Sequence, residues 1–317
     1  MTDHISIIQP GVFSTLQDGG RKGYASIGVG PGGVMDPYAY HAANRLLGNP
    51  ADSCVIEMHF PAPVIECNAD ITCSLTGADF NARLNDIDLA PWQTFQANKG
   101  DILQFKKKSN GFRCYLSMKG GFVANHWLNS YSTNTILKMG GFKGRRLQKG
   151  DLIPLNEAES VDRYQKKQMI SPEEYATIYD STTDVVCLPG PEWNQLNLAS
   201  QQTLLKDGFT LSVNSNRMAC LLENKNLKIE FPKSEMLSSA VIMGTVQLLP
   251  NGSLAILMAD HQTTGGFPRI LQVLQSQLPR LAQMSPGSIL RFRLTDQSEA
   301  EADFLSFMKK CSHGKIL

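Results

Sequence analysis

Short apolar runs, separated by turn-forming residues, limit what this sequence can fold into. The runs are β-branched or alternate apolar with polar residues, and each ends near Gly, Asn, Asp or Pro; they lie at 70–77, 101–107, 113–120, 184–190, 209–214, 227–231, 253–260 and 289–294. This pattern and length are typical of β-strands. The sequence therefore predicts a mainly β protein.

One local pattern occurs in both halves of the chain. A glycine turn precedes a strand at 99–105, 149–155 and 286–292. Glycine readily adopts the backbone conformations that tight turns require. Its occurrence in both halves suggests two related β-barrels.

Local signals predict a few helices between the strands. Asp36 is a predicted N-cap, with Pro37 at the first helical position and Gly48 as the stop. Ser171 to Glu174 and Ser298 to Glu301 both match capping boxes, the first with Pro172 at the helix start.

The other two helix predictions rest on apolar spacing. The helix after Ser298 would bury the apolar side chains Phe304, Leu305 and Met308. A further helix would begin near Pro268, carry Ile270, Leu271, Leu274 and Leu278 on one face, and break or kink at Pro279.

The length of the chain favours two domains. At 317 residues it exceeds what a single core usually organises. The polar segment 158–184 separates two strand-rich halves. We therefore expect one β-barrel domain over 1–180 and a second over 181–317.

Composition narrows the classes of partner and compartment. The formal net charge is +1, so we expect no nucleic-acid partner. The seven cysteines include no C-x-x-C pair, as expected of reduced thiols in a cytoplasmic protein. The N-terminus lacks signal-peptide features and no run has the length of a membrane span, so we expect no membrane association.

Gly28, Gly30 and Gly33 have the spacing of a dinucleotide-binding fingerprint. That fingerprint requires a strand, a turn and a helix within a parallel sheet, whereas the chain downstream is typical of antiparallel β. Pro31 also removes a backbone N–H that a phosphate cradle would use. We reject the nicotinamide interpretation, and the sequence also lacks a G-x-x-x-x-G-K-[ST] P-loop.

A family resemblance covers nearly the whole chain. Seven blocks appear in order: TLQDGGRKGY (15–24), GGVMDPYAYHAANRLLGN (32–49), SLTGAD (74–79), YLSMKGGF (115–122), LPGPEWN (188–194), NSNRMA (214–219) and ADHQTTGGFPRI (259–270). Together they resemble the 5-oxoprolinase C-subunit family, also called the KipA-like or biotin-dependent carboxyltransferase family. The resemblance implies two cyclophilin-like β-barrel domains with a few short helices.

The resemblance also implies an activity and partners. In the 5-oxoprolinase complex, the A, B and C subunits together open the lactam of 5-oxo-L-proline to L-glutamate using ATP. A related domain of urea carboxylase transfers a carboxyl group from biotin to urea. We therefore expect the A subunit and a KipI-like B subunit as partners, a small lactam or amide substrate, and ATP, with Mg, shared with the partner subunits.

The N-terminal blocks supply three candidate substrate-binding residues. Gln17 could hydrogen-bond an amide, and Arg21 could clamp a carboxylate or phosphate. The alternative is a structural Asp-Gly-Gly turn with Arg21 paired to Asp36. Asp36 is a third candidate, although helix capping alone accounts for it.

The C-terminal blocks supply six more candidates. Arg217 would anchor an anionic substrate group beside Asn216; its alternative is a surface arginine. We assign catalysis to Asp260, Gln262 and Thr264 and substrate binding to Thr263, because these residues precede two glycines and a predicted helix N-terminus. The alternative is a strand-to-helix turn with capping threonines.

Three departures from the family pattern leave the fine specificity open: His261, Phe267 and Ala219. An Asp260–His261 relay is excluded because adjacent strand residues face opposite ways. No histidine has metal-ligand spacing, so we expect no metal centre. Lys119 lacks the second methionine of a biotinyl site, so any biotin would arrive on a partner.

The leading hypothesis is the C subunit of an ATP-dependent 5-oxoprolinase, inactive alone and active as a complex. One alternative is half of a urea-carboxylase-type carboxyltransferase. A second alternative is a regulatory protein that binds a KipI-like partner without catalysis.

Overall fold

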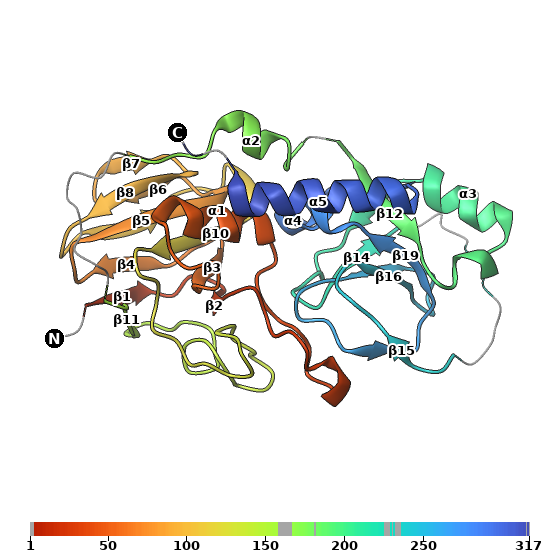
Figure 1. Cartoon of the computed structure of the whole chain (residues 1–317), viewed down its shortest axis with the longest axis horizontal. Helices are drawn as coiled ribbons and strands as arrows, with labels where there is room; N and C mark the ends of the chain where they lie inside the picture. The colour runs from red at the N-terminus through yellow and green to blue at the C-terminus, as the bar shows by residue number, and fades with distance from the viewer. Residues whose placement is uncertain are drawn as a thin grey trace. The chain divides into compact units, whose positions relative to one another are not determined.

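The protein is described here by a computed structural model of residues 3–157, 167–180, 182–224, 229, 231, 236–314 and 316. It is mainly β with a few short helices, which confirms the predicted fold class (Figure 1). The chain forms two compact units. The N-terminal unit comprises Met1–Arg21, Gly32–Thr177 and Lys310–Leu317, and the C-terminal unit comprises Lys22–Pro31 and Ile178–Lys309.

The N-terminal unit contains two antiparallel sheets. The first has the order β11-β1-β4-β9-β6-β7 and the second the order β2-β3-β10-β5-β8. One apolar cluster, including Ile5 of the first sheet and Leu116 of the second, draws on both. The strands are β1 His4–Gln9, β2 Ser14–Gln17, β3 Val55–His59, β4 Val64–Cys67, β5 Ile71–Asp79, β6 Ala82–Leu84, β7 Ile87–Leu89, β8 Gln93–Ala97, β9 Ile102–Phe105, β10 Asn110–Met118 and β11 Leu152–Pro154.

Helix α1, Pro37–Leu47, confirms the first helix prediction. Asp36 caps it by accepting a hydrogen bond from the Ala39 N–H, and Gly48 ends it with a left-handed backbone, φ 59°. Two hydroxyls of β5 donate to carbonyls of this helix: Ser74 to Ala43 at 2.8 Å and Thr76 to Ala39 at 2.7 Å. These bonds fix α1 on the second sheet.

The C-terminal unit is built on a closed barrel in the order β12-β19-β16-β17-β14-β13-β20. Neighbouring strands are antiparallel except β12 and β20, whose parallel pairing closes the barrel. A small sheet pairs β15 with β18. The strands are β12 Asp184–Pro189, β13 Phe209–Leu211, β14 Ala219–Glu223, β15 Ser239–Ala240, β16 Thr245–Leu248, β17 Leu254–Leu257, β18 Thr264–Gly265, β19 Arg269–Val273 and β20 Ile289–Leu294.

The remaining helices are short apart from the last. They are η1 Ala25–Ile27, α2 Pro172–Ala176, η2 Trp193–Gln195, α3 Leu198–Lys206, η3 Gln275–Gln277, α4 Leu278–Gln283 and α5 Gln297–His313. Ser171 is confirmed as the N-cap of α2, because its side chain accepts from the Glu174 N–H. Helix α3, capped by Asn197, was not predicted. In the described part of the chain, no helix combines the length and apolarity needed to cross a bilayer.

The helix predicted from Pro268 is wrong. Residues 269–273 form β19, which pairs with β12 and β16 inside the barrel. A short apolar run fits a buried strand as well as a helix, and tertiary pairing decided between them. Pro279 lies in the first turn of α4, where its missing N–H costs nothing, rather than breaking a helix.

The prediction for α5 is wrong in two details. Asp296, not Ser298, caps the helix by accepting from the Glu299 N–H at 2.9 Å. Phe304 is 42%, Leu305 68% and Met308 43% exposed, whereas Ala300, Phe307 and Cys311 are buried. Helix α5 carries two sets of apolar residues on different faces, and the sequence alone did not show which set is buried.

The two units do not divide the chain at a single point. Segments 22–31 and 310–317 each cluster with the unit that is more distant in sequence. The proposed division at residue 180 stays a prediction. Part of the candidate boundary, residues 158–166 and 181, and most of the predicted strand at 227–231 lie outside the described residues.

Candidate functional site

Asp18 is the centre of a buried polar cluster in the N-terminal unit. One carboxylate oxygen accepts from the hydroxyls of Ser130 at 2.6 Å and Ser132 at 2.5 Å and from the Gly20 N–H at 2.8 Å. The other accepts from the Tyr131 N–H at 2.5 Å. The carboxylate thus fixes the end of β2 to the loop 130–132, more than 100 positions away in sequence.

Gln17 and Arg21 lie on the same loop. The Gln17 amide donates to the Thr15 hydroxyl at 2.9 Å and the Thr133 carbonyl at 3.3 Å. Arg21, 2% exposed, donates to the Ser132 carbonyl, and its guanidinium carbon lies 4.7 Å from the Trp127 ring centroid. Both predicted binding residues are therefore engaged in holding the loop.

Asp36 belongs to a second buried chain of hydrogen bonds. Its N–H donates to the Tyr115 hydroxyl at 2.9 Å, and that hydroxyl donates to the Glu57 carboxylate at 2.8 Å. The Met35 N–H also donates to Glu57, at 2.8 Å. Burial, together with the charge of Glu57, raises the pKa of Tyr115, so this phenol stays protonated. Asp36 is 0% exposed and caps α1, as the alternative interpretation predicted.

Arg217 and Asp260 form the central ion pair of the C-terminal unit. The guanidinium contacts both carboxylate oxygens, with Nε to Oδ2 at 2.8 Å and Nη2 to Oδ1 at 3.0 Å. The Asp260 N–H also donates to the Arg217 carbonyl at 2.8 Å. The Arg217 side chain is 8% and the Asp260 side chain 23% exposed. Such a bidentate, partly buried pair fixes both groups in orientation.

Asn216 acts locally in the turn before β14. Its side-chain oxygen accepts from the Met218 N–H at 2.7 Å. Side chains of this kind commonly bond the backbone two residues on and stabilise a turn. In this structure Asn216 shapes the backbone that presents Arg217.

The loop 258–268 carries the remaining candidates, and it leads into a strand. Thr264 pairs with Ala240 in the small sheet, and the Thr263 carbonyl accepts from the Val241 N–H at 3.2 Å. The expected helix N-terminus is absent, because β19 begins at Arg269. The helix-dipole argument for an anion site at this loop therefore fails.

Two amide side chains meet under this loop. The Gln262 amide nitrogen lies 3.4 Å from the Gln247 side-chain oxygen. Gln247 is 1% exposed, and its Nε2 has no hydrogen-bond partner among the described residues. A Cβ on Gly265 would lie 2.4 Å from that nitrogen, so the glycine permits the close approach. Gln247 was not predicted from the sequence, because nothing in its strand distinguishes it.

His261 is buried, 5% exposed, and its Nδ1 lies 2.5 Å from the Gln262 carbonyl oxygen. Burial lowers the pKa of His261, with the Gln262 contact and Asp260 opposing it, so the imidazole is neutral near pH 7. It therefore cannot serve as a permanent cation for an anionic substrate.

Gly30 brings a distant segment to this loop. A Cβ at Gly30 would lie 2.6 Å from the His261 carbonyl oxygen, so the backbone of 22–31 packs directly on the loop. Of the three glycines that superficially match a dinucleotide fingerprint, Gly30 makes this close backbone approach, whereas a Cβ at Gly28 would meet nothing within 4 Å. This role of Gly30 could be recognised only from the tertiary structure.

The predicted site residues fall into two groups. Gln17, Arg21 and Asp36 belong to the N-terminal unit, and the other six belong to the C-terminal unit. Within the latter, Arg217 and Asp260 are paired, Gln262 follows Asp260 by two residues, and Thr264 lies on β18. Each group is an ordered set of hydrogen-bonding groups without an evident nucleophile.

Cysteine chemistry does not supply that nucleophile. All seven thiols are buried. Burial raises the pKa of Cys54, Cys67 and Cys311 to about 12, and it raises those of Cys73, Cys114 and Cys187 as well. These groups remain thiols at neutral pH and are poor nucleophiles. Among the described residues there is also no cluster of three His, Cys, Asp or Glu that could hold a metal ion.

Comparison with known proteins places the chain in a family. The protein-family model described as carboxyltransferase domain, subdomain A and B, matches residues 27–294 of this chain. The 5-oxoprolinase C subunit of Escherichia coli is 33% identical over 298 residues, and that of Haemophilus influenzae is 34% identical over 297 residues; each alignment covers 93% of both chains.

A solved structure has a similar fold over nearly the whole chain. The urea amidolyase of K. lactis matches with a TM-score of 0.88 at 26% identity over 98% of this chain, although the match spans only 20% of that larger protein. A likeness of this extent covers both units of the fold. The chain belongs to the family of the carboxyltransferase domain, subdomain A and B.

Proposed function

We propose that this chain is the C subunit of an ATP-dependent 5-oxoprolinase, which acts with the A and B subunits to open 5-oxo-L-proline to L-glutamate. The observation that carries the proposal is the 33–34% identity to two 5-oxoprolinase C subunits over 93% of both chains. In this proposal the chain is one component of a hydrolase and is inactive without its partners.

The C-terminal cluster suits part of such a site. A lactam is a resonance-stabilised amide, and opening it requires donors oriented toward the oxygen on which negative charge develops. The amides of Gln247 and Gln262 lie together beneath the loop 258–268. In this proposal they orient the lactam, and Arg217 is a positioning residue that holds the Asp260 carboxylate.

Three arginines of the described residues are engaged by carboxylates rather than aimed at an open phosphate site. A triphosphate site needs cationic groups aimed at the phosphates. Here Arg217 binds Asp260, Arg269 binds Glu192 and Arg145 binds Asp151, each at 2.8 Å or less. The N-terminus of α1 is occupied by the Asp36 carboxylate. We therefore assign ATP and its Mg to the assembled complex and derive no step through them.

The test is glutamate release from 5-oxo-L-proline and ATP by this chain mixed with its A and B homologues. We expect release only when all three are present, and a fall of about 100-fold on Asp260→Asn and of about 10-fold on Gln262→Ala. Thr264→Val tests the hydroxyl predicted from sequence, and Glu223→Gln, on an exposed residue of the same unit, is the control. Release without this chain would refute the proposal.

A urea-carboxylase-type carboxyltransferase is the second candidate. It is favoured by the TM-score of 0.88 to the K. lactis urea amidolyase over 98% of this chain. Lys119 lacks the second flanking methionine of a biotinyl site, so in this alternative the biotin comes on a partner. Carboxylation of urea by a biotinylated partner mixed with this chain, with no glutamate release by the three-component mixture, would establish this alternative.

A further inference from the structure

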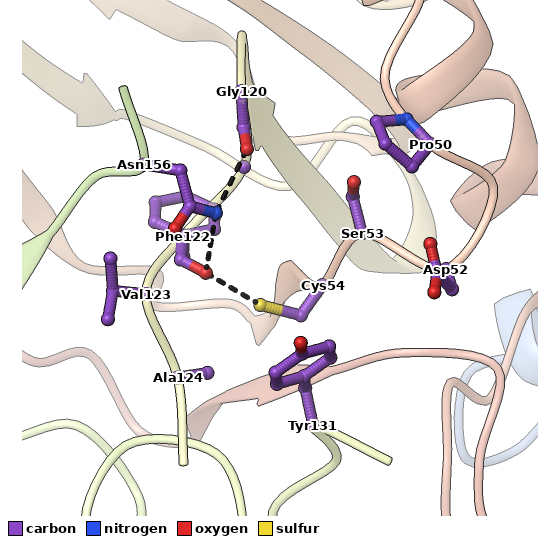
Figure 2. Close-up of a pocket in the computed structure, with 11 residues that line it drawn as sticks. Pro50, Asp52, Ser53, Cys54, Gly120, Phe122, Val123, Ala124, Tyr131 and Asn156 are labelled. Carbon is purple, nitrogen blue, oxygen red and sulfur yellow. Dashed lines mark hydrogen bonds between the residues drawn. The ribbon is translucent and has the colours of Figure 1, made fainter. Parts of the chain in front are cut away.

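A pocket lies within the N-terminal unit, and none of the residues assigned to catalysis lines it. Its volume is about 320 Å³, within the range of small-molecule sites of about 300–1,000 Å³. It is formed where the turn 50–54 faces the segment 120–124, with Tyr131 and Asn156 completing the wall (Figure 2).

The wall of this pocket is fixed by several hydrogen bonds. The Asn156 amide donates to the Gly120 carbonyl at 3.0 Å and contacts the Phe122 carbonyl at 3.5 Å, which also accepts from the Cys54 thiol (Figure 2). The Tyr131 N–H donates to Asp18, so the buried cluster described above anchors this side of the pocket. The pocket is therefore a built feature of the fold.

Three polar side-chain groups of the pocket are available to a ligand. Within the described part of the chain, the Asp52 carboxylate and the hydroxyls of Ser53 and Tyr131 have no hydrogen-bond partner, and none of them is buried. In the view of Figure 2, Ser53 and Tyr131 lie on either side of Cys54, with Asp52 beside Ser53. A ligand could therefore meet one carboxylate and two hydroxyls.

The charge of the lining selects the class of ligand. Asp52 is the one acidic residue in the lining, and the lining contains no lysine or arginine. The Cys54 thiol, with its pKa raised by burial to about 12, adds no charge. A carboxylate without a counter-ion attracts a cation and repels an anion such as the carboxylate of 5-oxoproline. The apolar lining residues Pro50, Val123 and Ala124 can cover a short hydrocarbon chain.

We propose that this pocket binds small primary ammonium compounds, with the ammonium group on Asp52, a hydrogen bond to the hydroxyl oxygen of Tyr131 or Ser53, and a short aliphatic chain along the apolar wall. The site is independent of the proposed lactam chemistry, which is assigned to the C-terminal unit. Its lining comes entirely from this chain.

The test compares three probes of nearly equal size on the full chain: n-butylammonium, butyramide and butyrate, each followed by saturation-transfer NMR and by titration of protein chemical shifts. We expect n-butylammonium to bind, butyramide to bind at least about tenfold more weakly, and butyrate not to bind. Butyrate binding as tightly as n-butylammonium would overturn the proposal without any variant.

Variants then locate the site. We expect Asp52→Asn to weaken n-butylammonium binding by about tenfold and Tyr131→Phe by about threefold. Asp86→Asn is the matched control, because Asp86 is an exposed carboxylate of the same unit that does not line the pocket. Circular dichroism melting of each variant checks that it is folded. Unchanged binding in folded Asp52→Asn would overturn the assignment.

Discussion

The two units hold their central carboxylates in opposite ways. In the N-terminal unit, Asp18 is 4% exposed and is satisfied by two hydroxyls and two backbone N–H groups. In the C-terminal unit, Asp260 is more exposed and is held by a bidentate guanidinium. The first carboxylate is shared by many neutral donors, whereas the second depends on one partner.

This difference distinguishes a carboxylate that stabilises the fold from a carboxylate that a ligand can still contact. A carboxylate surrounded by four short-range donors has little capacity left for a ligand, and its removal leaves several buried donors unpaired. A carboxylate on a single arginine keeps an accessible edge, and the arginine fixes its orientation. The comparison assigns Asp18 to the architecture and makes Asp260 the better candidate for contact with substrate.

The largest expected effect comes from breaking the Asp18 cluster. We expect Asp18→Ala to lower the free energy of unfolding of the N-terminal unit by about 3 to 4 kcal/mol, since four donors lose their acceptor. Denaturant unfolding can be followed by tryptophan fluorescence in a Trp193→Phe background, which leaves Trp92 and Trp127, both in this unit. Asp86→Ala is the control, and a loss below about 1 kcal/mol would contradict the structural assignment.

Breaking the ion pair between Arg217 and Asp260 should lower the free energy of unfolding of the C-terminal unit by a slightly smaller amount. We expect Arg217→Leu to destabilise that unit by about 3 kcal/mol, because it leaves Asp260 partly buried and unpaired. Adding Asp260→Ala should then cost little or restore stability, and the double-mutant cycle measures this coupling. Fluorescence of Trp193, in a background with Trp92→Phe and Trp127→Phe, reports on this unit. Additive losses would show that the pair is not coupled.

The sequence predicted what depends on local chemistry. The N-cap, the proline and the terminal glycine of α1 were all readable, since each acts within a few residues of its own position. Segment 269–273 was misassigned because its apolar spacing fits either a helix or a strand, and its pairing partners lie far away in sequence. The stripe of α5 that packs likewise depends on the surface that covers it.

The candidate site was predictable only as a set of residues. The blocks containing Asp18, Arg217 and Asp260 were recognised, but Arg217 and Asp260 are 43 positions apart, and their pairing is a tertiary fact. Gln247 was missed because a glutamine in a strand carries no local signal. The close contact of Gly30 with His261 was also invisible, because it joins segments more than 200 positions apart.

A third prediction tests how tightly the candidate loop is held in the C-terminal unit. Gly30→Ala places a Cβ 2.6 Å from the His261 carbonyl oxygen, and backbone must move to relieve the clash. We expect a loss of about 2 kcal/mol in this unit and none in the other. Gly266→Ala is the matched control in the same loop, because its Cβ would meet only ordinary contacts at 3.6 Å and beyond. Equal losses from both variants would mean that the close approach does not matter.

The smallest expected effect concerns pH and the ion pair between Glu192 and Arg269. Hydrogen bonds from Arg269 lower the pKa of Glu192, although burial opposes them. A carboxyl whose pKa is lower in the folded state binds fewer protons there than in the unfolded chain. Its stabilisation is therefore complete above the unfolded pKa of about 4.3 and is lost as the pH falls through the lower folded value.

We expect Glu192→Gln to cost the C-terminal unit about 1 kcal/mol at pH 7, because the glutamine still offers Arg269 a neutral acceptor. The deficit should shrink as the pH falls from about 5 to about 3, because the wild-type carboxyl also becomes neutral in that range. Unfolding followed through Trp193 at each pH measures it, with Glu223→Gln as the exposed control. A deficit that is constant over this range would show that the charge of Glu192 contributes nothing, and that its hydrogen bonds to Arg269 account for the stabilisation by this pair.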